Sequence, residues 1–498
     1  MFLLARTPIL ALVTFALAAP ALAGCFAAED GAPAAVADGP LAPALADGVM
    51  AVVSGVDGPV AAVLNETTPL VVPALYPVGS SAFEPTLGVA PDGAIYYGGF
   101  QGNLLVGFIP TVMKSTDGGK TWTDVSPKLP TGHGMPPETN DPYLYVDPAT
   151  GRVFQFAMAP ILVCAPLSWT DDGGQTWTTN PRGCGTVPPW DHQTMVAAKP
   201  RMLPTLNYPN VLHQCVNQIA TSQCSRSLDG GLTWSNGQPA SLGVEPEPPS
   251  AERPDAGFCG GLHGHVVAAP DGTVYLPKVQ CGKAIVSVSR DDGTTWESVT
   301  VTDVEPQASA DPAVAVDDAG NVYYLLEDVQ GALWLTTSVD AGRTWSTAVR
   351  VTPPGLTAHI PAIAAGAAGR IAIAFPGTTS LSAGYDSPDK EQDKAVWGAY
   401  IAVSVDALSP TPLFQIARVN EANDTLVSGR CGPGRCPGFL DFIDVVIGPD
   451  GRPYAAFVDA CESNECKNGD NDDAAAGVMG TLLEGPLLRD VDAAPPAS

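Results

Sequence analysis

The chain has 498 residues, and its 52 acidic residues outnumber 24 lysines and arginines to give a formal net charge of −28. A surface this acidic repels phosphate, so the composition argues against a nucleic-acid-binding protein. Beyond the N-terminal segment, no stretch is apolar over the roughly 20 residues that a membrane-spanning helix needs.

Residues 1–25 predict an export signal. One arginine precedes a long apolar run that ends in small residues, as in secretory signals. The phrase Leu22-Ala23-Gly24-Cys25 resembles the lipobox of prokaryotic lipoproteins, in which the cysteine becomes the lipidated N-terminus. The resemblance implies an extracytoplasmic protein that is anchored to the membrane through Cys25. The alternative is ordinary cleavage near Ala23 and secretion.

Residues 26–80 predict a flexible tether, because residues 26–69 are rich in Ala, Gly, Pro and Asp and have little to pack. Residues 70–77, near its end, are candidates for a strand that closes the domain that follows. Residues 486–498 end in Asp-Ala-Ala-Pro-Pro-Ala-Ser and predict a disordered tail.

Five copies of the pattern Ser/Thr-x-Asp-x-Gly-x-Thr-Trp mark the intervening residues 81–485. Their final tryptophans recur at intervals of 55, 57, 62 and 49 residues, and a degenerate sixth copy begins at Ser404. Ser and Asp side chains close a turn, Gly supplies a positive φ, and Trp begins the next strand. A repeat of this length is typical of β-propeller blades. The copies occupy residues 115–122, 170–177, 227–234, 289–296 and 338–345.

A second repeat, alternating apolar residues broken by Pro-Asp-Gly or Ala-Gly, predicts the first hairpin of each blade. Two hairpins make a four-stranded blade, so we expect an all-β fold with a single β-propeller over residues 81–485. Seven blades are expected; six is the fallback, because the unit that begins at Asp191 is irregular and the last blade has no box. The clear copies occupy residues 84–97, 141–154, 261–275, 311–324, 360–374 and 441–455.

The eight-residue pattern resembles the Asp-box, or BNR repeat, of the sialidase superfamily. The resemblance implies that each box is a structural hairpin on the face away from the ligand. It places ligands on the opposite face, formed by the loops that lead into the blades. We call these ends the box face and the loop face. The implied structural residues are Asp117, Trp122, Asp172, Trp177, Asp229, Trp234, Asp291, Trp296, Asp340 and Trp345.

The loop face is expected to carry the site residues. Carboxylates stand at or near the starts of inner strands around the central channel, histidines occupy similar places, and arginines lie in the loops before the blades. Such carboxylates suit a Ca²⁺ ion or the acid and base of a glycosidase; alternatively, each caps its own strand through local N–H groups. No metal is assigned with certainty, and Ca²⁺ is the one cofactor suggested. The candidates are Glu84, Asp141, Asp191, Asp311, Asp441, His192, His263, His359, Arg182, Arg253 and Arg430.

Ten cysteines besides Cys25 fall into five close pairs, which predicts disulfides in an extracytoplasmic protein. A zinc site is disfavoured, because no pair has Cys-x-x-Cys spacing. The pairs are Cys164/Cys184, Cys215/Cys224, Cys259/Cys281, Cys431/Cys436 and Cys461/Cys466.

The expected function is ligand binding on the loop face of a surface-anchored protein, with a glycan or a protein as the partner. One alternative is a glycoside hydrolase, including a sialidase-like exo-glycosidase; another is an assembly or scaffold factor. Sialidases grip a substrate carboxylate with an arginine in a Phe/Tyr-Arg-Ile/Leu-Pro phrase at the first blade, where this chain has Glu84. We therefore expect no sialoside hydrolysis, and whether the protein is an enzyme stays open.

Overall fold

The computed structural model describes twelve ranges and one single residue. The chain divides into residues 1–40 and a unit of residues 41–498, which contains every described residue. The predicted signal, Cys25 and residues 492–498 lie outside the described part. Within the described part, no helix is long and apolar enough to cross a membrane. The described residues are 49–55, 58–62, 69–103, 107–128, 141–158, 166–180, 191–218, 220–244, 260–308, 310–430, 441–461, 466 and 475–491.

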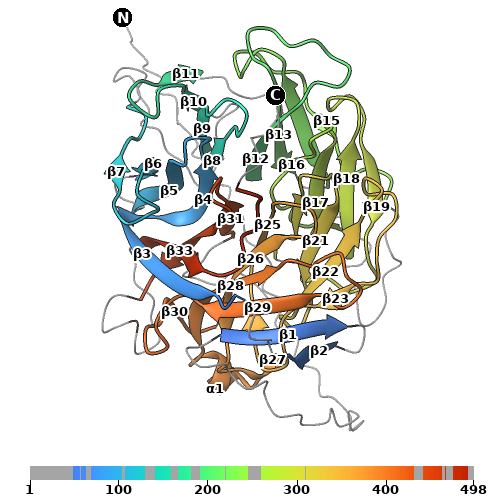
Figure 1. Ribbon diagram of the computed structural model, residues 1–498. Helices are drawn as coiled ribbons and strands as arrows, with labels where there is room; N and C mark the ends of the chain where they lie inside the picture. Colours follow the sequence, from blue (N-terminus) through green and yellow to red (C-terminus); the bar gives the residue numbers. More distant parts are fainter. Residues whose placement is uncertain are drawn as a thin grey trace, which may run out of the picture. The chain divides into compact units, whose positions relative to one another are not determined.

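Six sheets have four antiparallel strands each (Figure 1). Their members, sheet by sheet, are β4 (Phe83–Val89), β5 (Ile95–Asn103), β6 (Gly107–Ser115) and β7 (Thr123–Asp124); β8 (Asp141–Val146), β9 (Val153–Met158), β10 (Leu167–Thr170) and β11 (Thr178–Asn180); β12 (Asp191–Ala198), β13 (Val211–Asn217), β14 (Ser222–Ser227) and β15 (Gln238–Pro239); β16 (Val267–Ala268), β17 (Val274–Gln280), β18 (Lys283–Ser289) and β19 (Glu297–Thr300); β20 (Ala313–Val316), β21 (Val322–Glu327), β22 (Leu333–Ser338) and β23 (Val349–Arg350); β31 (Asp444–Ile447), β32 (Pro453–Asp459), β33 (Ala476–Glu484) and β3 (Val72–Ser81).

A further sheet has eight strands. A short excursion between two of them, β26 and β28, holds β27 (Ser382–Tyr385) and the single-turn helix α1 (Asp389–Gln392). The eight strands are β24 (Thr357–Ala358), β25 (Ala362–Ala365), β26 (Ile371–Thr378), β28 (Val396–Ser404), β29 (Leu413–Arg418), β30 (Val427–Ser428), β1 (Val49–Gly55) and β2 (Gly58–Ala61).

The innermost strands of all these sheets contact one another in a closed ring, in the order β4, β8, β12, β16, β20, β25, β31 and back to β4. The prediction of one all-β propeller with four-stranded blades is confirmed. Six sheets have this regular four-stranded form, and this number matches the lower of the two predicted blade counts, six rather than seven. The larger eight-stranded sheet contributes β25 to the same ring.

The core lies between neighbouring sheets. Phe156 and Trp169 of one sheet, for example, pack with Met195 and Leu212 of the next in a single buried cluster. Such packing buries one face of each strand, and the alternating apolar residues of the hairpins supply that face.

Each Asp-box forms the same hydrogen-bonded turn. In all five, the Asp carboxylate accepts the backbone N–H of the Thr four residues on at 2.8–2.9 Å, and it also accepts that residue's hydroxyl. The Ser or Thr hydroxyl that opens the box accepts the N–H of the fifth residue, a Gly, at 2.9 Å. That Gly has a positive φ in every box, which explains why the pattern requires it.

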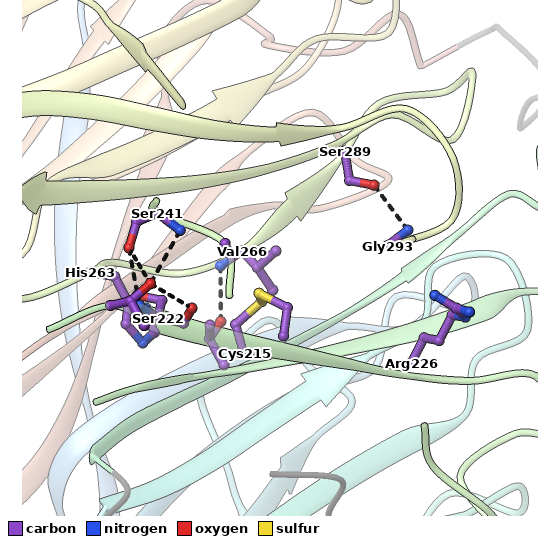
Figure 2. The surroundings of a disulfide bond; sticks show 12 residues. Cys215, Ser222, Arg226, Ser241, His263, Val266, Ser289 and Gly293 are labelled. Carbon is purple, nitrogen blue, oxygen red and sulfur yellow. Dashed lines mark hydrogen bonds between the residues drawn. A yellow bond between two sulfur atoms is a disulfide. The ribbon is translucent and has the colours of Figure 1, made fainter. Parts of the chain in front are cut away.

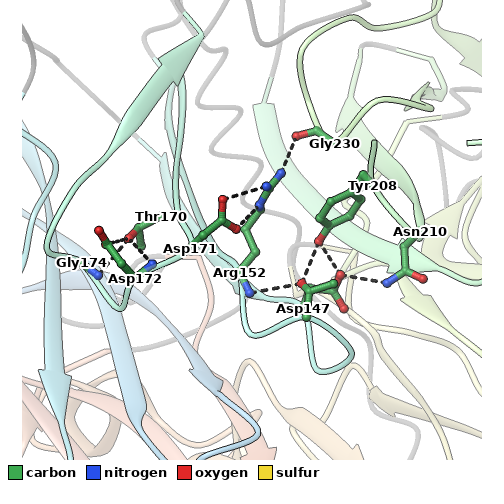
Figure 3. Close-up of polar contacts among 10 residues, drawn as sticks. Asp147, Arg152, Thr170, Asp171, Asp172, Gly174, Tyr208, Asn210 and Gly230 are labelled. Carbon is green, nitrogen blue, oxygen red and sulfur yellow. Dashed lines mark hydrogen bonds and ion pairs between the residues drawn. The ribbon is translucent and has the colours of Figure 1, made fainter. Parts of the chain in front are cut away.

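Contacts on the box face join neighbouring sheets. Arg152, in the turn between β8 and β9, pairs with Asp171 at 2.6 and 2.8 Å and donates to the carbonyl of Gly230 in the next sheet's box (Figure 3). Its guanidinium lies 4.6 Å from the ring centre of Tyr208. The indole of Trp177 likewise donates to the carbonyl of Val125 at 2.8 Å, toward the preceding sheet. These contacts give the box face a packing role.

The N-terminal segment differs from the flexible tether expected over residues 26–80. β1 pairs along β29 and carries β2 on its outer side, as Figure 1 shows. β3 pairs with β33, so the last regular blade combines a strand from near the start of the chain with three from its end. The physical reason is that Val49, Ala51 and Val52 are buried and the backbone of β1 completes an open sheet edge.

Two of the predicted disulfides are confirmed. Cys215 and Cys224 stand directly opposite each other on β13 and β14, with Cα atoms 4.1 Å apart (Figure 2). Cys461 and Cys466 also form a disulfide. Cys281 is disulfide-bonded to a cysteine outside the described residues. The remaining predicted pairs fall on residues outside the described part: Cys164, Cys184, Cys259, Cys431 and Cys436.

Candidate functional site

Five of the predicted site residues meet at the loop end of the ring. Glu84 lies in β4, Asp141 begins β8, His192 is the second residue of β12, and Asp311 and Asp441 precede β20 and β31. Each of the five is at most 6% exposed. We call this group the axial cluster. It is formed because the inner strands all begin at the same end of the ring.

His192 is the centre of the axial cluster. Its Nδ1 lies 3.0 Å from Oδ2 of Asp311, and its Nε2 lies 3.2 Å from Oδ2 of Asp441. The strand β31 is three positions from β12 around the ring, so the imidazole reaches across the axis. Only the imidazolium form has an N–H on both nitrogens. The two contacts therefore favour a positive charge between the carboxyl groups.

Local backbone irregularity directs two members of the cluster inward. The pairing of β4 with β5 shifts register between Phe83 and Thr86, and the pairing of β12 with β13 shifts between Asp191 and Thr194. Within these bulges Glu84 and His192 have φ values of 48° and 50°, in the left-handed region that side chains disfavour. A bulge re-aims a side chain. The strained backbone therefore places both groups at the axis.

Glu84 is a buried carboxyl group whose surroundings favour its neutral form. Burial raises its pKa well above the usual range, and the nearby carboxyl groups of Asp141 and Asp441 raise it further, against an opposing effect of His192. Its Oε2 is buried and has no hydrogen-bond partner among the described residues. The backbone N–H of His192 donates to Oδ2 of Asp141 at 3.2 Å. The cluster thus places a carboxyl group whose neutral form is favoured beside other carboxyl groups.

Lys278, which sequence analysis missed, lies beside the cluster. It is fully buried in β17, and its Nζ donates to Oδ1 of Asn217 and to the carbonyl of Gly261. Burial lowers the pKa of Lys278 to about 7, with Asp311 acting in the opposite direction. Nδ1 of the neighbouring His263 donates to the Gly264 carbonyl at 2.9 Å, and burial lowers the pKa of His263 well below the usual value. A lone lysine inside an apolar strand was the available signal.

His359 belongs to a separate buried group. Its Nδ1 lies 3.1 Å from Glu327 Oε2 and 3.1 Å from the hydroxyl of Tyr385, which donates to Glu327 Oε1 at 2.5 Å. Glu327 also accepts the backbone N–H of Ile360, whose φ is 37°. Sequence analysis named His359 but missed Glu327 and Tyr385, because they come from other repeats and stand at no repeated position.

The remaining candidates do not join the axial cluster. Arg430 is about half exposed and pairs with Asp389 and Asp393 at 2.9 and 3.3 Å, beside helix α1. Arg182 and Arg253 lie outside the described residues, as does the side chain of Asp191. Within the described part, no three His, Cys, Asp or Glu side chains are grouped so as to hold a metal ion. The place between Asp311 and Asp441 is taken by the imidazole of His192.

Residues 205–375 match the family described as a BNR repeat-like domain. This stretch contains three of the five boxes, so the family match supports the repeat assignment made from the pattern alone. No curated protein matches the chain.

Solved structures with similar arrangements include a protein of unknown function from Dyadobacter fermentans, at 14% identity over 84% of this chain and 98% of that one, with a TM-score of 0.41. An α-L-arabinanase from Penicillium chrysogenum, complexed with arabinobiose, has 13% identity over 72% and 99%, with a TM-score of 0.39. An intramolecular trans-sialidase from Ruminococcus gnavus, in complex with oseltamivir carboxylate, has 14% identity over 81% and 97%, with a TM-score of 0.38. We draw no inference on activity from similarities of this size.

Proposed function

We propose that this protein is an extracytoplasmic binding propeller that takes a neutral glycan on its loop face, with the axial cluster at the base of the site. The axial cluster is the observation that carries the proposal. Buried carboxyl groups and left-handed backbone at Glu84 and His192 both lower stability, and strain of this kind concentrates at functional sites.

The chemistry of the cluster favours hydroxyl-rich ligands. Carboxyl oxygens accept hydrogen bonds from sugar hydroxyls, and the raised pKa of Glu84 favours a protonated form that can also donate one. An anionic sugar would meet the carboxyl groups of Asp141, Asp311 and Asp441 and would be repelled. A signal ending at Cys25 would present this face outside the cell, tethered to a membrane.

A glycan array with the mature protein tests the proposal. We expect neutral glycans to bind and sialylated glycans not to bind. Asp441→Asn removes one partner of His192 and should weaken binding at least about tenfold. The matched control is Glu484→Gln, which alters an exposed carboxylate at the far end of β33. A preference for sialylated glycans, or unchanged binding by Asp441→Asn, would contradict the proposal. Binding to a protein partner only would favour the scaffold alternative.

One observation favours a glycoside hydrolase as the second candidate. Burial and the nearby Asp141 raise the pKa of Glu84 and favour its protonated form, and an acid beside a second carboxyl group is the pairing that glycosidases use. A panel of chromogenic glycosides tests this, with a fluorogenic sialoside expected to show no turnover. Glu84→Gln keeps the shape of the side chain but has no acidic proton. Hydrolysis that is lost in this variant while glycan binding persists would establish the enzyme.

A further inference from the structure

A cavity of ≈ 290 Å³ runs along the ring axis beneath the axial cluster. Its lining reaches from Asp311 and Asp441 at the loop end to Arg489 at the box end, and every inner strand contributes to it. At about 30 Å³ per water molecule, the volume equals that of roughly ten waters. The cavity, which we call the axial cavity, is therefore large enough for a small organic molecule.

Most of the axial cavity is apolar, but two polar side chains face it midway. Asp444 is the first residue of β31, and His265 lies just before β16. Their side chains are 16% and 23% exposed, although both residues line the cavity inside the ring. The Asp444 carboxyl accepts the backbone N–H groups of Leu87 and Val445 at 2.9 and 2.8 Å. His265 Nε2 is buried with no hydrogen-bond partner in the described part of the chain.

The charges around the axial cavity favour a cation. Asp311, Asp441 and Asp444 line it, with His192 between the first two. Burial and, to a smaller extent, the nearby His192 lower the pKa of His265 to about 3, so the imidazole of His265 is neutral. Burial raises the pKa of Asp444 to about 7. Among the described residues, no lysine or arginine forms an ion pair with Asp444, and His265 Nδ1 is 3.9 Å away and uncharged. A cation beside Asp444 would therefore meet a carboxylate that is not already neutralised by these residues.

Aromatic rings stand next to this carboxylate. Tyr143 and Phe442 both line the axial cavity, and the ring of His265 lies between them, with centroid distances of 5.1 and 5.2 Å. Aromatic rings combined with carboxylates recognise organic ammonium groups, because the ring faces attract the positive charge electrostatically. Apolar side chains of the inner strands suit the remainder of such a molecule.

We propose that the axial cavity binds a small organic ammonium ion, with its charged nitrogen beside Asp444, Tyr143 and Phe442 and its apolar part along the inner strands. This site lies beneath the proposed glycan site and shares Asp311 and Asp441 with it, but the binding of an ammonium ion beside Asp444 does not depend on glycan binding. Arg489, which is 38% exposed and 3.9 Å from Asp318, marks the box end as the side where the cavity lining reaches solvent.

Calorimetry with the mature protein tests the proposal, with choline and tetramethylammonium as the cations and 3,3-dimethyl-1-butanol as the uncharged counterpart of choline. We expect both cations to bind and the alcohol to bind at least about tenfold more weakly. Asp444→Asn should remove most of this preference, and Glu484→Gln should keep it. Phe442→Leu, which retains an apolar side chain, should weaken the binding of both cations. This variant provides the test if Asp444→Asn does not fold.

The pH dependence gives an independent readout. His265 lies 3.9 Å from Asp444 and Tyr143 is close enough to interact with it, whereas Asp311, Asp441 and Arg489 are charged groups elsewhere in the lining of the same cavity. Burial raises the pKa of Asp444 to about 7, so this carboxyl group loses its proton between pH 6 and pH 8. Choline should bind more tightly at pH 8 than at pH 6, and binding should release protons near pH 7. Failure of both cations to bind, equal binding of the alcohol, or unchanged selectivity in both variants would overturn the proposal. Glycan binding by Asp444→Asn should persist, so the two proposals can fail separately.

Discussion

Replacing His192 with Gln is expected to destabilise the protein more than any substitution of an exposed residue. The imidazole is 3% exposed and lies 3.0 and 3.2 Å from the carboxyl groups of Asp311 and Asp441. Removing one partner from a buried ion pair leaves a buried charge uncompensated, which costs about 3–5 kcal/mol. A Gln amide donates to only one of the two carboxyl groups at a time, so we expect about 3 kcal/mol.

Guanidinium unfolding at pH 7, followed by tryptophan fluorescence, measures this loss. A double-mutant cycle with Asp441→Asn separates the contact from other effects, and we expect a coupling energy of about 1–3 kcal/mol. Glu484→Gln serves as the control and should leave the free energy of unfolding within about 0.5 kcal/mol of the original. If His192→Gln matched that control and the coupling energy were near zero, the carboxyl groups would not depend on the imidazole and the reasoning would fail.

Three further predictions concern stability. Hydrogen bonds from the Thr176 hydroxyl and N–H lower the pKa of Asp172 to about 2, below its unfolded value of about 3.9. Asp172→Ala should therefore lower the melting temperature at pH 7. The difference in melting temperature from the original protein should disappear as the pH falls through 2. Burial lowers the pKa of Lys278 to about 7, against about 10.4 in the unfolded chain. Between these pH values the unfolded chain binds one more proton than the folded protein, so the stability of the original protein should rise with pH. Melting scans of Lys278→Met from pH 7 to pH 9 should lack that rise. Replacing both Cys215 and Cys224 with Ala opens a loop with a sequence separation of 9 and should cost about 2–3 kcal/mol in chemical unfolding, whereas an unchanged midpoint would exclude a stabilising disulfide.

Local sequence patterns predicted the fold because the relevant interactions are local. Each box closes on itself within eight residues: the carboxylate of Asp117 accepts the N–H of Thr121, and the hydroxyl of Ser115 accepts the N–H of Gly119. A reader of the sequence needs only Asp, Gly and Trp at the right spacing to place these hairpins. The strands β1 and β2 could not be placed in this way, because β2 pairs with β1, and β1 in turn pairs with β29, more than 350 residues later in the chain.

The same distinction applies to the axial cluster. Its members were named from their positions at the starts of inner strands, and those positions determine that Glu84, Asp141, Asp311 and Asp441 share one end of the ring. Their partners were not predictable, because His192 meets Asp441 across 249 positions of sequence and is directed inward by a bulge in β12. The group of His359, Glu327 and Tyr385 likewise joins parts of different repeats.

The sequence by itself determined the repeating unit, the turn chemistry of the boxes, the four-stranded blade and the side of the ring to which the acidic residues belong. Tertiary structure alone decided that a histidine bridges two carboxyl groups across the axis, that Asp444 and His265 face a cavity, and that β1 and β2 extend the eight-stranded sheet, whereas a closing strand at residues 70–77 was expected from the sequence. The physical reason is that periodicity and turn residues report contacts between near neighbours in the chain. Contacts across the ring depend on its closure, which no single repeat encodes.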